Sequence, residues 1–173
     1  MQHLRTSDGT RGIDRRVIVP AELPHSASAA RRFSTDTLAP DVMRAALLSC
    51  ATELGECLRG RRQAAKAVTL TVSFAGSSQL IRSRQLPGGP SAHTDDLRNL
   101  AYDLYRSMAL QRARVRGVAV RGEQLVAAET VAEQLSLDAM REDRLRAEQA
   151  VDALNRRYGS GTVGPAASYR HAG

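Results

Sequence analysis

The chain has 173 residues, of which 42% are apolar and only 3% aromatic, and its formal net charge is +7. This length allows one compact domain with tails and excludes a large multi-domain enzyme. No apolar run approaches the roughly 18 residues that span a bilayer and no signal peptide opens the chain, so we expect a cytoplasmic protein without a membrane partner.

The positive charge is concentrated in the middle of the chain. Residues 31–121 hold 15 basic and 7 acidic residues, whereas residues 122–173 hold 6 basic and 8 acidic residues. Lys66 is the only lysine, so nearly all of this charge is arginine. A basic central domain favours a polyanionic partner, with nucleic acid ahead of an acidic membrane surface.

The first part of the chain is predicted to be a linker that leads into a strand and then a helix. Glycines and prolines interrupt residues 1–30, with one short apolar run at residues 17–19. A strand is expected over residues 31–36, around Phe33. Apolar residues at helical spacing then predict a helix over residues 41–59, with Gly60 as its stop. Cys50 and Cys57 would lie roughly 10 Å apart on this helix, too far for a disulfide, and are predicted to be core residues in a reducing compartment.

The middle of the chain predicts a hairpin, a second helix and a last strand. Apolar and polar residues alternate over residues 66–74, which indicates a strand with one buried face, and residues 79–86 form its hairpin partner. Thr94 is the expected N-cap of a helix that runs to about Leu110. A strand is predicted over residues 114–125, with Val118 and Val120 toward the core.

These elements alternate in the order β-α-β-β-α-β. Such a chain forms an α+β fold, here a four-stranded antiparallel sheet with both helices on one face. The other face is then open, and the strand over residues 66–74 places threonine and serine on it. We therefore predict a linker over residues 1–30, a folded domain over residues 31–126, and a tail over residues 127–173 with a helix from Ala139 to Tyr158.

Several short segments resemble the little finger, the C-terminal domain of DinB-type Y-family translesion DNA polymerases. The resemblance covers roughly residues 11–167, and its segments are Ser26-Ala27-Ser28-Ala29-Ala30-Arg31-Arg32-Phe33, Arg82-Ser83-Arg84, Arg114-Val115-Arg116-Gly117-Val118, Gln134-Leu135-Ser136-Leu137 and Asn155-Arg156-Arg157-Tyr158-Gly159. Two positions depart from the family pattern. Ala30 stands where the family usually has Glu, and Asp138 stands where a clamp-binding peptide often ends in Phe.

The resemblance implies a module that grips duplex DNA through the phosphate backbone and carries no catalytic palm, metal or cofactor of its own. The expected DNA-binding residues are Lys66, Thr69, Thr71, Arg82, Ser83, Arg84, Arg114 and Arg116. Arg82 and Arg84 share parity with Leu80 and Leu86, so either a bulge shifts their register or they project past the sheet edge. Arg59, Arg61 and Arg62 are weaker candidates, because they also complement the dipole of the helix that they end.

A second binding function is implied for the tail. The residues Gln134, Leu135, Ser136, Leu137 and Asp138 are similar to the peptide by which bacterial polymerases bind the sliding clamp. A weak tether of this kind is effective because it raises the local concentration of the bound partner. The alternative for this segment is the first turn of the last helix, packed on the domain.

Two other function classes remain open at this stage. One is a regulatory protein that binds the sliding clamp or a catalytic polymerase subunit without gripping DNA. The other is an RNA-binding α+β domain, which would stack bases on exposed aromatic residues of its sheet. The strands offer only Phe33 and Phe74 for stacking, and the parity of Phe74 points it toward the core.

Overall fold

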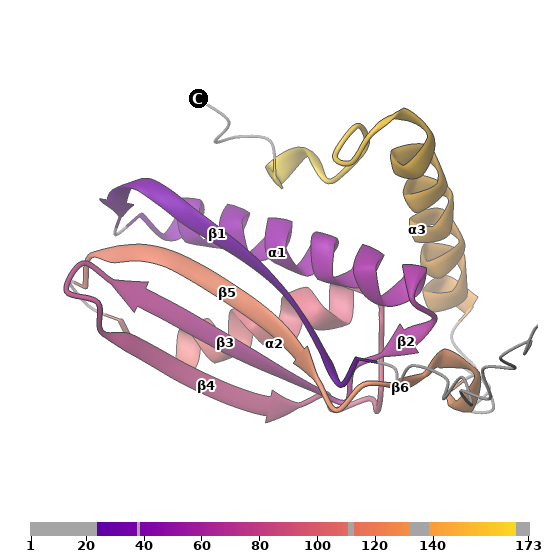
Figure 1. Ribbon diagram of the computed structural model, residues 1–173, viewed down its shortest axis with the longest axis horizontal. Coiled ribbons are helices and arrows are strands. Elements are labelled where there is room, and N and C mark those ends of the chain that lie inside the picture. Colours follow the sequence, from indigo (N-terminus) through magenta and orange to yellow (C-terminus); the bar gives the residue numbers. More distant parts are fainter. Residues whose placement is uncertain (1–23, 38, 111–112, 132–138, 169–173) are drawn as a thin grey trace, which may run out of the picture.

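The computed structural model describes residues 24–37, 39–110, 113–131 and 139–168. The predicted α+β fold is confirmed, and Figure 1 shows its main sheet in front of the first two helices, with the last helix at the side. The strands and helices are β1 (Ser26–Thr37), α1 (Pro40–Gly60), β2 (Gln63–Ala64), β3 (Ala67–Phe74), β4 (Gln79–Gln85), α2 (Thr94–Ser107), β5 (Val115–Glu123), β6 (Val126–Ala127) and α3 (Ala139–Tyr158). Two short 3-10 turns, η1 (Ala128–Thr130) and η2 (Ala166–Ser168), complete the described elements.

The main sheet is antiparallel throughout, with the strand order β1-β5-β3-β4. The helices α1 and α2 pack on one face, α1 beneath β1 and β5 and α2 beneath β3 and β4. Among the described residues, no helix covers the opposite face (Figure 1). A small second sheet, which the sequence did not predict, pairs β2 with β6 at one end of the molecule.

The hydrophobic core lies between the main sheet and the two helices. Its largest fully buried residues are Met43, Leu47, Leu54, Leu58, Val68, Leu70, Val72, Leu97, Leu104 and Val120. These positions follow a spacing of three or four residues in the helices and of two in the strands, which is why the sequence pattern located the elements. Cys50 is fully buried in this core, and Cys57 is partly buried at its margin.

The first strand is longer than the sequence predicted. It begins at Ser26, inside the segment predicted as linker, rather than at Arg31. Its additional core residues are Ala27 and Ala29, both buried, and they pair with β5. Alternation carried only by alanine and serine gives little contrast in hydropathy, so this half of the strand was missed.

A bulge in β5 lies beside a close approach of β1 to β5. Ser73 pairs with Gly117 and Phe74 pairs with Val115, so Arg116 is an extra residue in the ladder between β3 and β5. A Cβ atom on Gly117 would lie 2.8 Å from the carbonyl oxygen of Arg31. Glycine is therefore required at this position if β1 is to stay against β5.

Helix ends differ from the prediction in three places. The helix α2 ends at Ser107 rather than at about Leu110. The residue at the N-cap of α2 is His93, and Thr94 is already helical, so the predicted cap was placed one residue too late. The helix α1 includes Gly60 and is capped by Arg61. The helix α3 has the predicted bounds. It ends at Tyr158 because Gly159 follows it with a φ of 110°. Within the described ranges, no helix has the length and apolar character needed to cross a membrane.

Candidate nucleic-acid interface

The face of the sheet that no helix covers carries mainly small, hydroxyl-bearing and basic side chains. The strand register assigns its members. They are Ser26, Ser28, Ala30 and Arg32 of β1, Gly117, Ala119, Arg121 and Glu123 of β5, Ala67, Thr69, Thr71 and Ser73 of β3, and Gln79, Ile81, Ser83 and Gln85 of β4. We call this surface the open face.

One row of the open face combines a cation with three hydroxyls. Ser28 pairs with Arg121, Arg121 pairs with Thr69, and Thr69 pairs with Ser83, so the row crosses all four strands. The Thr69 hydroxyl donates to Ser83 Oγ at 2.9 Å. Thr69 itself is only 9% exposed and uses its hydroxyl in this bond, so the exposed donors of the row are Ser28, Arg121 and Ser83. Such donors can contact phosphate oxygens, and these contacts hold a nucleic acid without reading its sequence.

The side chain of Arg121, on an inner strand of the sheet, is 56% exposed. Its Nη2 donates to Ser26 Oγ at 2.7 Å, and its Nε lies 4.0 Å from a carboxylate oxygen of Glu123. The hydrogen bond orients the guanidinium, while the distant and exposed carboxylate contributes little. Arg121 is therefore available to a polyanion that binds the open face.

The structure separates Arg82 and Arg84 from the other predicted residues. The pairing of β3 with β4 is unbroken from Ala67 to Ser73, so no bulge shifts the register. Arg82 pairs with Leu70 and Arg84 with Val68, which places both arginines on the helix side of the sheet. They remain exposed because β4 is an edge strand. The sequence left open a bulge or a projection past the sheet edge, and the register agrees with the projection. Of Arg82, Ser83 and Arg84, Ser83 alone lies on the open face.

The remaining predicted residues lie at opposite ends of the sheet. Lys66 is exposed just before β3. Its backbone N–H donates to the carbonyl oxygen of Glu123, and its carbonyl oxygen accepts from the N–H of Leu86. Arg114 and Arg116 are exposed at the other end, where β5 begins. Arg116 Nε lies 3.1 Å from a carboxylate oxygen of Asp36, so its charge is already paired.

The open-face residues missed by the sequence reasoning include Arg121, Ser28 and Arg32. Arg121 has the opposite parity to Val118 and Val120, so the period of two in the predicted last strand could have identified it. Ser28 and Arg32 belong to β1, whose first half was predicted as linker and whose second half was considered only for its core residue. Arg32 is exposed and pairs with Gly117, which leaves it unobstructed by a side chain on the neighbouring strand.

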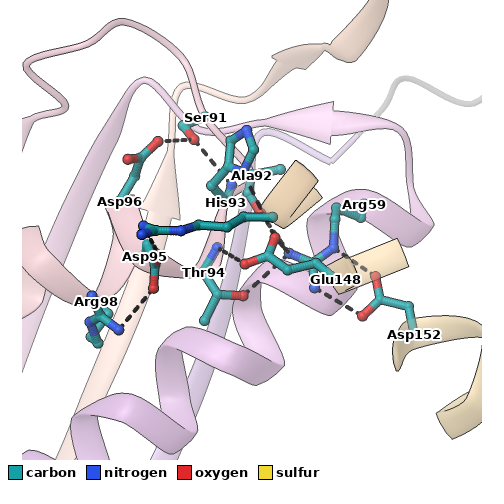
Figure 2. A network of polar contacts seen from close by, with 11 residues as sticks. Arg59, Ser91, Ala92, His93, Thr94, Asp95, Asp96, Arg98, Glu148 and Asp152 are labelled. Carbon is teal, nitrogen blue, oxygen red and sulfur yellow. Dashed lines mark hydrogen bonds and ion pairs between the residues drawn. The ribbon is translucent and has the colours of Figure 1, made fainter. Parts of the chain in front are cut away.

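Arg59 is excluded from the interface because it is buried in an ion-pair network (Figure 2). Its side chain is only 9% exposed, and it contacts the carboxylates of Glu148 and Asp152. Burial by itself lowers the pKa of Arg59, but the hydrogen bond with Asp152 and the negative charges of Glu148, Asp152 and Glu56 outweigh this effect and raise the pKa. Arg61 and Arg62, which follow α1, are exposed.

The predicted clamp-binding residues Gln134, Leu135, Ser136, Leu137 and Asp138 lie outside the described residues. Among the residues that are described, no group of three His, Cys, Asp or Glu side chains could hold a metal ion.

Comparisons with known proteins agree on one family. A model of the impB/mucB/samB family C-terminal domain matches residues 24–137, which include all four strands of the main sheet and the helices α1 and α2. No curated protein matches the sequence.

Solved structures with the same fold include two polymerases. One is described as an insertion ternary complex of Dbh DNA polymerase, with 16% identity and a TM-score of 0.51. The other is the crystal structure of DinB from Sulfolobus solfataricus, with 16% identity and a TM-score of 0.50. Each match covers 59% of this chain and only 29% of the solved chain.

Proposed function

Because the chain belongs to the impB/mucB/samB family of Y-family polymerases and carries its C-terminal domain, we propose that it grips duplex DNA through the open face of its sheet. The observation that carries this proposal is the row of Ser28, Arg121, Thr69 and Ser83 across the four strands. The proposed contacts are to phosphate oxygens and are independent of base sequence. A grip of this kind tolerates damaged bases, as translesion synthesis requires.

The electrostatics of the domain support the same partner. Residues 31–121 carry a net charge of +8, from 15 basic and 7 acidic residues. Each phosphate that this surface neutralises releases a counterion from the DNA, which contributes favourably to binding at low salt. RNA is a weaker candidate, because Phe33 and Phe74 of the described strands pack against the core and give no stacking platform on the open face.

The proposed function has two finer parts. In the first part of the proposal, the chain performs no nucleotidyl transfer itself, a reaction that uses a pair of metal ions held by acidic residues. Its DNA grip then serves a catalytic polymerase domain in the cytoplasm. The segment Gln134-Leu135-Ser136-Leu137-Asp138 tethers the protein to the sliding clamp. The competing proposal is an interaction protein that binds the clamp or a polymerase subunit without gripping DNA.

A salt series of DNA titrations tests the grip. The full chain is titrated into a fluorescent primer–template duplex of arbitrary sequence, and then into a duplex of scrambled sequence. The logarithm of the association constant is expected to fall linearly with the logarithm of salt concentration, by about 0.9 per phosphate contacted, equally for both sequences. Absence of binding at low salt would contradict the DNA grip and favour the competing proposal.

A separate measurement tests the tether. The double substitution Gln134→Ala with Leu135→Ala is expected to abolish binding to the sliding clamp from the same organism while DNA affinity stays unchanged. Clamp binding that survives the double substitution would contradict the assignment of this peptide.

A further inference from the structure

The helix α3 lies beyond the residues that match the family model, yet it is docked on the folded domain. Figure 1 shows it beside the C-terminal end of α1. Its buried residues on this side are polar: Asp152 and Asn155 are each 4% exposed. Buried polar groups require partners, so the docking depends on specific hydrogen bonds and charges and not on apolar packing alone.

Arg59 of α1 is the centre of these contacts (Figure 2). Its Nε donates to Asp152 Oδ2 at 2.6 Å and its Nη2 to Asp152 Oδ1 at 2.9 Å. Its Nη1 donates to Glu148 Oε2 at 2.8 Å and to the carbonyl oxygen of Ala92 at 2.8 Å. The guanidinium therefore binds one carboxylate through two parallel bonds and a second carboxylate one helical turn away on α3.

The helix α1 has a gap in its side chains where the guanidinium lies. A Cβ atom on Gly55 would be 2.9 Å from Arg59 Nη1 and 2.9 Å from Thr94 Oγ1. Glycine at this position thus makes room for Arg59 to reach α3 and α2 together. The site is part of the fold of α1 and not an incidental surface ion pair.

Glu148 also completes the N-terminus of α2. His93 occupies the N-cap position, and its side chain makes no capping hydrogen bond. Instead, Glu148 Oε1 accepts a hydrogen bond from the backbone N–H of Thr94 at 3.0 Å. The first turn of α2 is therefore capped by a carboxylate from α3, which satisfies a backbone donor and complements the helix dipole.

The helix α2 in turn supports the hairpin of β3 and β4. Leu97, Leu100 and Leu104 of α2 share a core with Val68 and Leu70 of β3, and α2 also contacts β4. A contiguous series of contacts thus leads from α3 through the N-terminus of α2 to the strands that carry Thr69 and Ser83.

The segment after α3 is fastened to the same helix layer. Asn155 Nδ2 donates to the carbonyl oxygen of Val163 at 3.0 Å, and the N–H of Val163 donates to Asn155 Oδ1 at 2.9 Å. These two bonds turn the chain back, and η2 then contacts α1. The arm formed by α3 and η2 is consequently attached through α3, which contacts Arg59, Thr94 and, by way of Arg144, Asp95, and again through η2.

We propose that α3 is a brace held by an ionic latch, in which Arg59 binds Glu148 and Asp152 and the docked helix stabilises the first turn of α2 and the β3–β4 hairpin. The domain that works as one unit then extends past the residues matched by the family model, as far as η2. This brace is independent of the ligand of the open face.

Hydrogen exchange of the full chain with the substitution Asp152→Asn tests the brace. Asp152 contacts Arg59, and none of its described hydrogen bonds or ion pairs is with α2. Loss of its charge is expected to release α3 and, with it, the Glu148 cap. Amides in the first turn of α2 and in β4 should exchange roughly ten times faster, the factor expected from loss of a charged hydrogen bond.

The matched control is Glu142→Gln, which removes one negative charge from the same helix. Glu142 is exposed and pairs with Arg146 only at 3.8 Å, so protection should not change. Unchanged protection of α3 in Asp152→Asn would contradict the latch. Faster exchange of α3 with α2 unaffected would contradict the brace.

A second variant covers the case in which Asp152→Asn unfolds the whole domain, seen as equal loss of protection in β1 and β5. Glu148→Ala removes the cap and the contacts of Glu148 with Arg59 and His93, but it leaves the bidentate pair of Arg59 with Asp152. Loss of protection confined to α3, α2 and β4 supports the brace. Uniform loss across the sheet, or no loss, overturns it.

Discussion

The substitution Arg121→Gln should weaken DNA binding, and the exposure and contacts of Arg121 allow the loss of affinity to be calculated. The guanidinium is 56% exposed, and its one strong contact is a neutral hydrogen bond with Ser26. If this guanidinium neutralises one phosphate, its removal lowers the slope of log K against log salt concentration by about 0.9 in magnitude. Because 0.1 M lies one decade below 1 M, the association constant at about 0.1 M salt should fall about eightfold, or by about 1.2 kcal/mol. The measurement is the titration of a fluorescent duplex across a salt series.

The control for this substitution is Arg106→Gln, which changes the net charge equally on the helix side of the sheet. Arg106 lies in the last turn of α2, and its side chain is 72% exposed. Its substitution should leave the slope unchanged, because it is not on the open face. An unchanged slope for Arg121→Gln would refute a phosphate contact at Arg121. Equal losses for the two variants would show that only the net charge matters.

Three further predictions concern the sheet and the core. Gly117→Ala should lower the unfolding free energy by about 1–3 kcal/mol, since its Cβ would lie 2.8 Å from the carbonyl oxygen of Arg31; an unchanged urea midpoint would argue against this close approach. Thr69→Val removes the hydroxyl that donates to Ser83. It should change the unfolding free energy by no more than about 1.5 kcal/mol and reduce DNA affinity in the same titration. An affinity equal to that of the unsubstituted chain would exclude Thr69 from the interface. Burial raises the pKa of Cys50 from 9.0 to about 12, so the unfolded chain loses this proton first and stability should fall between those pH values by up to about 1.4 kcal/mol per pH unit. Urea titrations at several pH values would measure this slope, and a Cys50→Ala variant with the same slope would refute the assignment.

The elements that the sequence predicted best are those in which apolar and polar residues contrast strongly. The alternation over residues 66–74 located β3, and the stop at Gly159 located the end of α3. The first half of β1 was not predicted because Ala27 and Ala29 are barely more apolar than their serine neighbours. The cap of α2 was beyond prediction from local sequence, since Glu148 is 54 residues from Thr94 along the chain.

The candidate interface was predicted only in part for a related reason. Alternation alone assigned Thr69 and Thr71 to the open face, and the register confirms that placement. Arg82 and Arg84 were selected for their charge, but their parity puts them on the helix side of an edge strand. Whether an arginine on the helix side of an edge strand is covered or exposed depends on how far the helix layer extends beneath it. The sequence of the strand does not contain that information.

The single lysine of the chain offers a practical consequence. Lys66 has an exposed side chain, and its backbone is fixed between Glu123 and Leu86. An amine-reactive dye would therefore label one defined side chain in addition to the terminal amine, at the end of the sheet opposite Arg114. Fluorescence energy transfer from that dye to an acceptor at one end of a duplex would report the direction in which the DNA lies across the strands.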